Sequence, residues 1–123
     1  TYGDKEWKIG IKNPRGDGII GILNVKGNNF ISTSGDYERF FVENGKRYCH
    51  IFDPDTCKPP TVAVSATVVG ENGAETDVYS TAFFIIGKAS EEMADNVGVR
   101  LVGFDSNLDT FGNSGGLSIF EKR

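Results

Sequence analysis

The chain has 123 residues and a formal net charge of −4, with 38% hydrophobic and 24% charged residues. This length fits one domain spanning residues 1–123. The acidic balance and the absence of a basic patch argue against nucleic acid as a partner. No apolar run approaches the roughly 20 residues that a membrane-spanning helix needs. The first residue is Thr1 rather than Met, so we expect a processed chain or a piece of a longer one.

Short strand patterns separated by turn signals run through most of the sequence. In chain order they cover residues 7–11, 19–25, 30–34, 61–69, 99–104 and 117–120. Alternation within 61–69 predicts that Val62, Val64, Ala66 and Val68 share one face, with Ala63, Ser65 and Thr67 on the other.

Two helices are expected between the last strands. The first covers residues 77–86, with Thr76 as N-cap and Gly87 just past its end, and the second covers 91–96 after Ser90. At about 100° per residue, Phe84 falls opposite the apolar stripe of the first helix. The expected stripe comprises Val78, Tyr79, Ala82, Phe83, Ile85 and Ile86. Runs of strands with one or two helices predict an α+β fold with a mainly antiparallel sheet.

The clearest hairpin signal is Asn44-Gly45, a dipeptide typical of a type I′ turn. With these as the two loop residues, Glu43 faces Lys46 and Arg39 faces His50.

His50 is the only histidine. Histidine is the usual general base at neutral pH, and a neighbouring Arg39 would lower the pKa of His50 and keep the ring neutral. The alternative is a half-buried strand histidine that contributes only packing.

Asp77 and Thr81 are spaced i, i+4, so their oxygens are expected on one helix face. A carboxylate and a hydroxyl are hard ligands of the kind that Mg²⁺ takes. The alternative is an aspartate in the first helical turn and an unrelated surface threonine.

Two glycine-containing segments have residue types that occur in ligand-binding turns. Ser34-Gly35-Asp36 follows a predicted strand, and its backbone N–H groups could bind anionic oxygens, although such a turn is also common without a ligand. The segment 112–116 has no predicted helix after it, so it does not match a nucleotide loop of the P-loop or Rossmann kind.

Four segments in fixed order resemble the ApbE-type FAD:protein FMN transferases, which are bacterial flavinylating enzymes. They are W-x-x-G-I-x-x-P from Trp7, S-G-D-Y-E-R from Ser34, H-I-x-D-P-x-T from His50 and D-x-x-x-T-A from Asp77. The resemblance runs from about residue 7 to 87 and corresponds to the C-terminal half of the family's larger fold. It implies that an N-terminal half, which supplies a further metal ligand and much of the flavin pocket, is missing here.

The resemblance also implies the reaction and the residues. FAD is cleaved at its pyrophosphate in a Mg²⁺-dependent step, FMN passes to a threonine hydroxyl of an acceptor flavoprotein, and AMP leaves. Asp77 and Thr81 correspond to metal ligands, and His50 to the residue that helps activate the acceptor hydroxyl. The flavin nucleotide site would be lined by Ser34, Gly35, Asp36 and Ile51.

Further expectations follow from the same resemblance. The acceptors would be subunits of ion-pumping respiratory reductases, and the full-length parent would be a lipoprotein on the periplasmic or cell-surface side of a bacterial inner membrane. Two alternatives stay open: a non-catalytic flavin-binding or protein-interaction module, and a pyrophosphatase that hydrolyses FAD to FMN and AMP.

The two cysteines mark departures from the family pattern. Cys49 stands where the family usually has His, and Cys57 stands where it usually has Gly. A disulfide between them would close a small loop, and two free thiols are the alternative.

Overall fold

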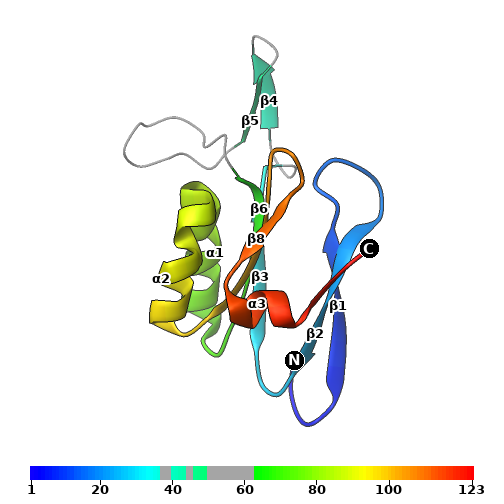
Figure 1. Cartoon of the computed structure of the whole chain (residues 1–123), viewed down its shortest axis with the longest axis vertical. Helices are drawn as coiled ribbons and strands as arrows, with labels where there is room; N and C mark the ends of the chain where they lie inside the picture. Colours follow the sequence, from blue (N-terminus) through cyan, green and yellow to red (C-terminus); the bar gives the residue numbers. More distant parts are fainter. Residues whose placement is uncertain (37–39, 44–45, 50–62) are drawn as a thin grey trace.

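The computed structural model describes residues 1–36, 40–43, 46–49 and 63–123 (Figure 1). Within these ranges the strands are β1 (Glu6–Lys12), β2 (Ile19–Lys26), β3 (Phe30–Gly35), β4 (Phe40–Glu43), β5 (Lys46–Cys49), β6 (Ala63–Gly70), β7 (Arg100–Asp105), β8 (Thr110–Gly112) and β9 (Phe120–Lys122). The helices are α1 (Gly73–Ile86), the 3₁₀ turn η1 (Gly87–Ala89), α2 (Ser90–Val97) and α3 (Ser114–Ser118). None of these helices is long and apolar enough to cross a membrane.

The strands pair only antiparallel in the described ranges, which confirms the predicted α+β class. A central sheet has the order β3-β6-β7-β8, a second sheet has the order β1-β2-β9, and β4 pairs with β5. Helices α1 and α2 lie on one side of the central sheet, and the sheet of β1 and β2 lies on the other (Figure 1). All eight residues of β6 are buried because both faces of this strand are covered.

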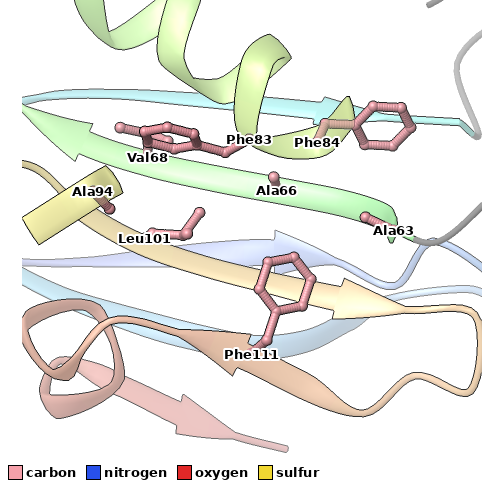
Figure 2. Packing of buried hydrophobic residues seen from close by; sticks show 8 residues of the cluster. All are labelled: Ala63, Ala66, Val68, Phe83, Phe84, Ala94, Leu101 and Phe111. Atoms are coloured by element: carbon pink, nitrogen blue, oxygen red, sulfur yellow. The ribbon is translucent and has the colours of Figure 1, made fainter. Parts of the chain in front are cut away.

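Two apolar clusters fill the spaces between these layers. Figure 2 shows the cluster under the helices, where side chains of α1 and α2 gather with those of β6, β7 and β8. Its buried members are Ala63, Ala66, Val68, Phe83, Phe84, Ala94, Leu101 and Phe111. The second cluster joins the central sheet to β1 and β2, and its buried members are Ile11, Ile20, Leu23, Val25, Val64, Val69, Val102 and Phe104.

A register shift in β6 changes the alternation expected from the sequence. The pairing of β6 with β7 is irregular between Ala63 and Ser65. Ala63 therefore joins Ala66 in the cluster under the helices, whereas Val64 joins the cluster on the other face. The prediction that Val64 and Ala66 share a face was wrong, because one extra residue at a bulge reverses the alternation.

The β4–β5 pairing has the register that the Asn44-Gly45 signal predicts. Glu43 is opposite Lys46, and Phe41 is opposite Tyr48. The predicted neighbours Arg39 and His50 lie outside the described residues.

Helix α1 begins one turn earlier than predicted. The side chain of Asn72 accepts a hydrogen bond from the Glu75 backbone N–H at 3.0 Å, so Asn72 is the N-cap. Thr76 lies inside the helix, where its hydroxyl donates to the carbonyl oxygen of Asn72 at 2.6 Å. The predicted end is confirmed: Gly87 has a φ of 78° and its N–H donates to the Phe83 carbonyl.

The buried face of α1 also differs from the expected apolar stripe. Phe84 is fully buried, whereas Val78 is 64% exposed and Ile86 is 38% exposed. The stripe prediction is confirmed for Tyr79, Ala82, Phe83 and Ile85, which lie in or against the apolar cluster. It was wrong for Val78, Ile86 and Phe84, because the first half of the helix turns Ser80, rather than an apolar side chain, toward the sheet. Phe83 and Phe84 then both reach the central sheet in the second half (Figure 2).

Helix α2 starts at Ser90, not after it. The Ser90 hydroxyl donates to the Gly87 carbonyl at 2.6 Å, so this residue closes the preceding 3₁₀ turn and does not serve as the N-cap.

The C-terminal segment contains a helix, α3, that begins in the predicted loop before residue 117 and runs into the start of the predicted strand 117–120. Asn113 caps α3 by accepting from the Gly116 N–H at 2.9 Å, and it also accepts from the Leu101 N–H and donates to the Val99 carbonyl. The expectation that no helix follows 112–116 was therefore wrong, since one buried asparagine organises this glycine-rich segment. The final strand β9 covers only the last part of the predicted 117–120 strand and continues beyond it.

Candidate functional site

The first half of α1 lies against β3 through polar side chains. Two serines of β3, Ser32 and Ser34, face three residues of the helix. Ser32 Oγ donates to Asp77 Oδ1 at 2.9 Å and lies 3.1 Å from Ser80 Oγ. Ser34 Oγ lies 2.9 Å from Ser80 Oγ and 3.2 Å from Thr81 Oγ1. These five residues are called the hydroxyl cluster below.

The depth of burial varies across the hydroxyl cluster. Ser80 is fully buried and Ser34 is 9% exposed, whereas Asp77 is exposed and Thr81 is half-buried. Buried hydroxyls are costly unless they are hydrogen-bonded, and both buried serines have partners here. The cluster therefore presents the Asp77 carboxylate and the Thr81 hydroxyl toward the surface, and the hydrogen-bonded serines lie beneath them.

The structure brings two of the predicted site segments together. Thr81 contacts Ser34, so the expected metal-ligand pair on α1 adjoins the Ser34-Gly35-Asp36 segment of β3. Ser32 and Ser80 were not singled out from the sequence. Their signal was present as alternation of Ser32 with Ser34 along one strand, and as the i, i+3 spacing of Ser80 from Asp77.

The donor set of the cluster fits a hard cation. Asp77 supplies a carboxylate and Thr81 a hydroxyl, and Mg²⁺ takes oxygen ligands in an octahedral arrangement. In the described ranges no three His, Cys, Asp or Glu side chains gather into a metal site. The pair would thus hold Mg²⁺ only together with waters, phosphate oxygens or ligands from another segment.

Asp36 is anchored by an arginine from the β1–β2 loop. Arg15 Nη1 donates to Asp36 Oδ1 at 2.7 Å, and Arg15 Nη2 donates to Asp36 Oδ2 at 2.6 Å. The backbone N–H of Asp36 donates to the Val64 carbonyl at 3.1 Å. The Asp36 side chain is 11% exposed and that of Arg15 is 29% exposed, so the pair is largely removed from water. This bidentate ion pair fixes the backbone that follows Ser34 and Gly35.

Arg15 is a further residue that sequence reasoning missed. It lies in a loop that the sequence marks only by its proline and glycines, and no periodicity links it to Asp36, 21 residues away. The predicted site residues His50 and Ile51 lie outside the described residues, as does Cys57, so the possible Cys49–Cys57 disulfide stays a prediction.

The fold and the site together define an α+β domain that holds an oxygen-rich cluster between a helix and an antiparallel sheet. The sequence model of the ApbE family matches residues 1–102. The chain belongs to the ApbE family.

Curated relatives bear one shared name. The chain is 35% identical over 102 residues to an FAD:protein FMN transferase of Rhodobacter capsulatus, covering 82% of this chain and 20% of that relative. It is 39% identical over 85 residues to an FAD:protein FMN transferase of Klebsiella pneumoniae, covering 67% of this chain and 27% of that relative. The chain thus spans about a fifth to a quarter of the length of these relatives.

Solved structures share the fold. The ApbE protein of Thermotoga maritima has a TM-score of 0.85 and 32% identity, covering 98% of this chain and 41% of that chain. The apo flavinyl transferase ApbE of Pseudomonas stutzeri has a TM-score of 0.73 at 22% identity, which shows a likeness of fold.

Proposed function

We propose that this chain is part of a Mg²⁺-dependent FAD:protein FMN transferase, which moves FMN from FAD to a threonine hydroxyl of an acceptor flavoprotein. Membership of the ApbE family and the shared name of the curated relatives support this activity. The observation that carries the proposal is that Asp77 meets Ser32, and Thr81 meets Ser34, along one edge of the helix–sheet junction. Hard oxygen ligands can hold a metal that neutralises the charge of a pyrophosphate, and the backbone N–H groups of the turn at Ser34-Gly35-Asp36 would bind its anionic oxygens.

Each predicted residue has a role in this reaction. Asp77 and Thr81 would hold Mg²⁺, which supplies neutralisation of the pyrophosphate charge when it is bound. Ser34, Gly35 and Asp36, with Ile51, would line the flavin nucleotide site.

His50 would accept the proton of the acceptor threonine. The threonine oxygen then forms a bond to the phosphorus of the FMN moiety, and the bond from that phosphorus to the bridging oxygen breaks. The bridging oxygen and its electron pair leave with AMP. The transferred FMN stays bound to the acceptor as a phosphoester.

The biological setting is proposed on the same resemblance. The acceptors would be flavoprotein subunits of respiratory reductases. The protein would act on the periplasmic or cell-surface side of a bacterial inner membrane, anchored as a lipoprotein.

The test uses a full-length protein in which this sequence replaces the matching segment of the Thermotoga maritima relative, called the exchange protein below. With FAD, Mg²⁺ and an acceptor domain, the exchange protein should release AMP and leave covalent flavin on the acceptor. Chelation by EDTA should abolish both products. Free FMN without covalent flavin would instead indicate a pyrophosphatase, and bound flavin without AMP release a non-catalytic module.

Substitutions then test the residue roles. Asp77→Ala should lower transfer at least about 100-fold, because loss of a ligand exceeds the 10–100-fold cost of losing an outer hydrogen-bond partner of a metal site. Glu75→Ala is the control, since Glu75 is also acidic, exposed and in the first turns of α1. Unchanged transfer in Asp77→Ala would remove the metal assignment.

The role of His50 has its own signature. His50→Ala should abolish transfer while FAD still binds, as measured by quenching of flavin fluorescence. Transfer at the wild-type rate would exclude His50 from the reaction.

A further inference from the structure

The two predicted metal ligands are the two ends of one series of hydroxyl contacts. From Thr81 Oγ1 the series runs to Ser34 Oγ at 3.2 Å, to Ser80 Oγ at 2.9 Å, to Ser32 Oγ at 3.1 Å and to Asp77 Oδ1 at 2.9 Å. Each hydroxyl has one proton to donate and two lone pairs to accept with. The direction of the series can therefore be deduced by assigning protons from the carboxylate end.

The carboxylate accepts, so Ser32 donates to Asp77 and its only proton is used. The proton of Ser80 has three acceptors within reach, Ser32 Oγ at 3.1 Å, Ser34 Oγ at 2.9 Å and the Asp77 carbonyl oxygen at 2.9 Å. Only donation to Ser32 makes all four contacts of the series hydrogen bonds, because the proton of Ser32 is already used. In this assignment Ser80 accepts from Ser34.

The same count fixes the proton of Thr81. Because Ser34 donates to Ser80, the contact between Thr81 and Ser34 needs the proton of Thr81. The other acceptor near the Thr81 hydroxyl is the Asp77 carbonyl oxygen, which is farther away at 3.4 Å. With its proton directed to Ser34, Thr81 keeps its lone pairs for another partner.

We propose that Ser80 and Ser32 are positioning residues, which orient Asp77 and Thr81 through this directed series of hydrogen bonds. The proposal rests on the proposed function, since it assigns Asp77 and Thr81 to Mg²⁺. Ser80 is fully buried between helix and sheet, so it would act on Asp77 and Thr81 from beneath them. Hydrogen bonds in such a series polarise one another, and partners that hold a ligand in place commonly contribute to metal affinity.

A second hydroxyl pair in the same sheet provides a matched control. Thr33 Oγ1 lies 2.9 Å from Thr67 Oγ1, on strands β3 and β6. Thr33 lies between Ser32 and Ser34, so it points to the opposite face of the sheet. Thr67 is 2% exposed, so Thr67→Val removes the buried hydroxyl of a partly buried pair that does not include a residue of α1.

The experiment measures metal binding and turnover in the exchange protein. Mn²⁺ is titrated in the presence of FAD, with free Mn²⁺ followed by electron paramagnetic resonance, and the half-saturating Mg²⁺ concentration for AMP release is determined separately. Ser32→Ala and Ser80→Ala should each weaken Mn²⁺ binding and raise half-saturating Mg²⁺ by about 10-fold or more. Ser32→Thr, which keeps the hydroxyl, should restore both values to within about 3-fold of wild type. Thr67→Val should leave both unchanged.

The outcomes separate this inference from the proposed function. Thermal unfolding first confirms that each variant is folded, and Ala at position 80 is favourable in a helix. If wild-type exchange protein transfers flavin with Mg²⁺ but Ser32→Ala and Ser80→Ala match Thr67→Val in both metal readouts, the positioning role is overturned. If the wild-type exchange protein shows no Mg²⁺-dependent reaction, the proposed function itself fails.

Discussion

The two halves of α1 meet the same sheet in different ways. The first half lies on β3 through Ser80 and its hydroxyl partners, and it leaves Asp77 exposed. The second half buries Phe83 and Phe84 in the apolar cluster under the helices (Figure 2). Apolar packing is non-directional, whereas each hydrogen bond fixes a donor and an acceptor. The second half thus supplies stability, and the first half supplies orientation for the candidate site.

The largest expected effect is on stability, from the apolar half. Phe84→Ala should lower the free energy of unfolding by about 3–5 kcal/mol, because a fully buried ring is replaced by a cavity. Urea denaturation followed by circular dichroism measures the change. If Phe84→Ala lowered the free energy of unfolding no more than a substitution at an exposed position of the same helix, the second half of α1 would not be the stabilising half.

The next effect concerns the ion pair beside the hydroxyl cluster. Arg15→Ala should lower the free energy of unfolding by about 2 kcal/mol, because it leaves the Asp36 carboxylate largely buried without its partner. This value lies between those typical of buried and of exposed ion pairs. Lys8→Ala is the control, since Lys8 is exposed and donates to Asn24 at the surface. Equal midpoints for the two variants in urea would show that Arg15 does not stabilise the turn.

A smaller effect is expected at the start of the polar half. Asn72→Ala should lower the free energy of unfolding by about 1 kcal/mol, because the helix loses its cap. Asn72→Asp and Asn72→Ser should retain most of the capping stabilisation, because both side chains can accept the same hydrogen bond. Thermal unfolding of the three variants compares them. If Ala and Ser are equally stable at position 72, the cap bond to Glu75 contributes nothing.

The smallest effect is expected on the outer face of α1. Val78→Ser should change the free energy of unfolding by less than about 0.5 kcal/mol, because Val78 is 64% exposed despite its place in the apolar stripe read from the sequence. If Val78→Ser lowered the free energy of unfolding as much as Phe84→Ala, Val78 would belong to the buried face of the helix, as the sequence predicted. Chemical denaturation of both variants side by side makes this comparison directly.

Much of the strand architecture could be predicted from local patterns. Alternation located β1, β2, β3 and most of β6, and the Asn44-Gly45 dipeptide predicted the register in which Glu43 pairs with Lys46. These features depend on neighbours in sequence, so the pattern contains the information. The bulge before Ser65 escaped prediction because it depends on how β6 pairs with β7.

In the candidate site too, local patterns identified some residues, and the contacts between distant segments escaped prediction. The i, i+4 spacing identified Asp77 and Thr81, and the turn after β3 identified Ser34, Gly35 and Asp36. Nothing local connected Ser80 to Ser32, which is 48 residues away, or Arg15 to Asp36. Each of these contacts joins elements that only packing brings together.

The sequence by itself determined the α+β class, the family resemblance and the positions of the oxygen-bearing residues, because spacing and residue type are properties of the chain. Only the tertiary structure decided which face of α1 is buried and which hydroxyls meet. When apolar and polar residues are both distributed around a helix axis, either the apolar or the polar side chains can face the sheet. Its rotation on the sheet was decided by Ser32 and Ser34 on one strand and by the space for Phe84 beneath it.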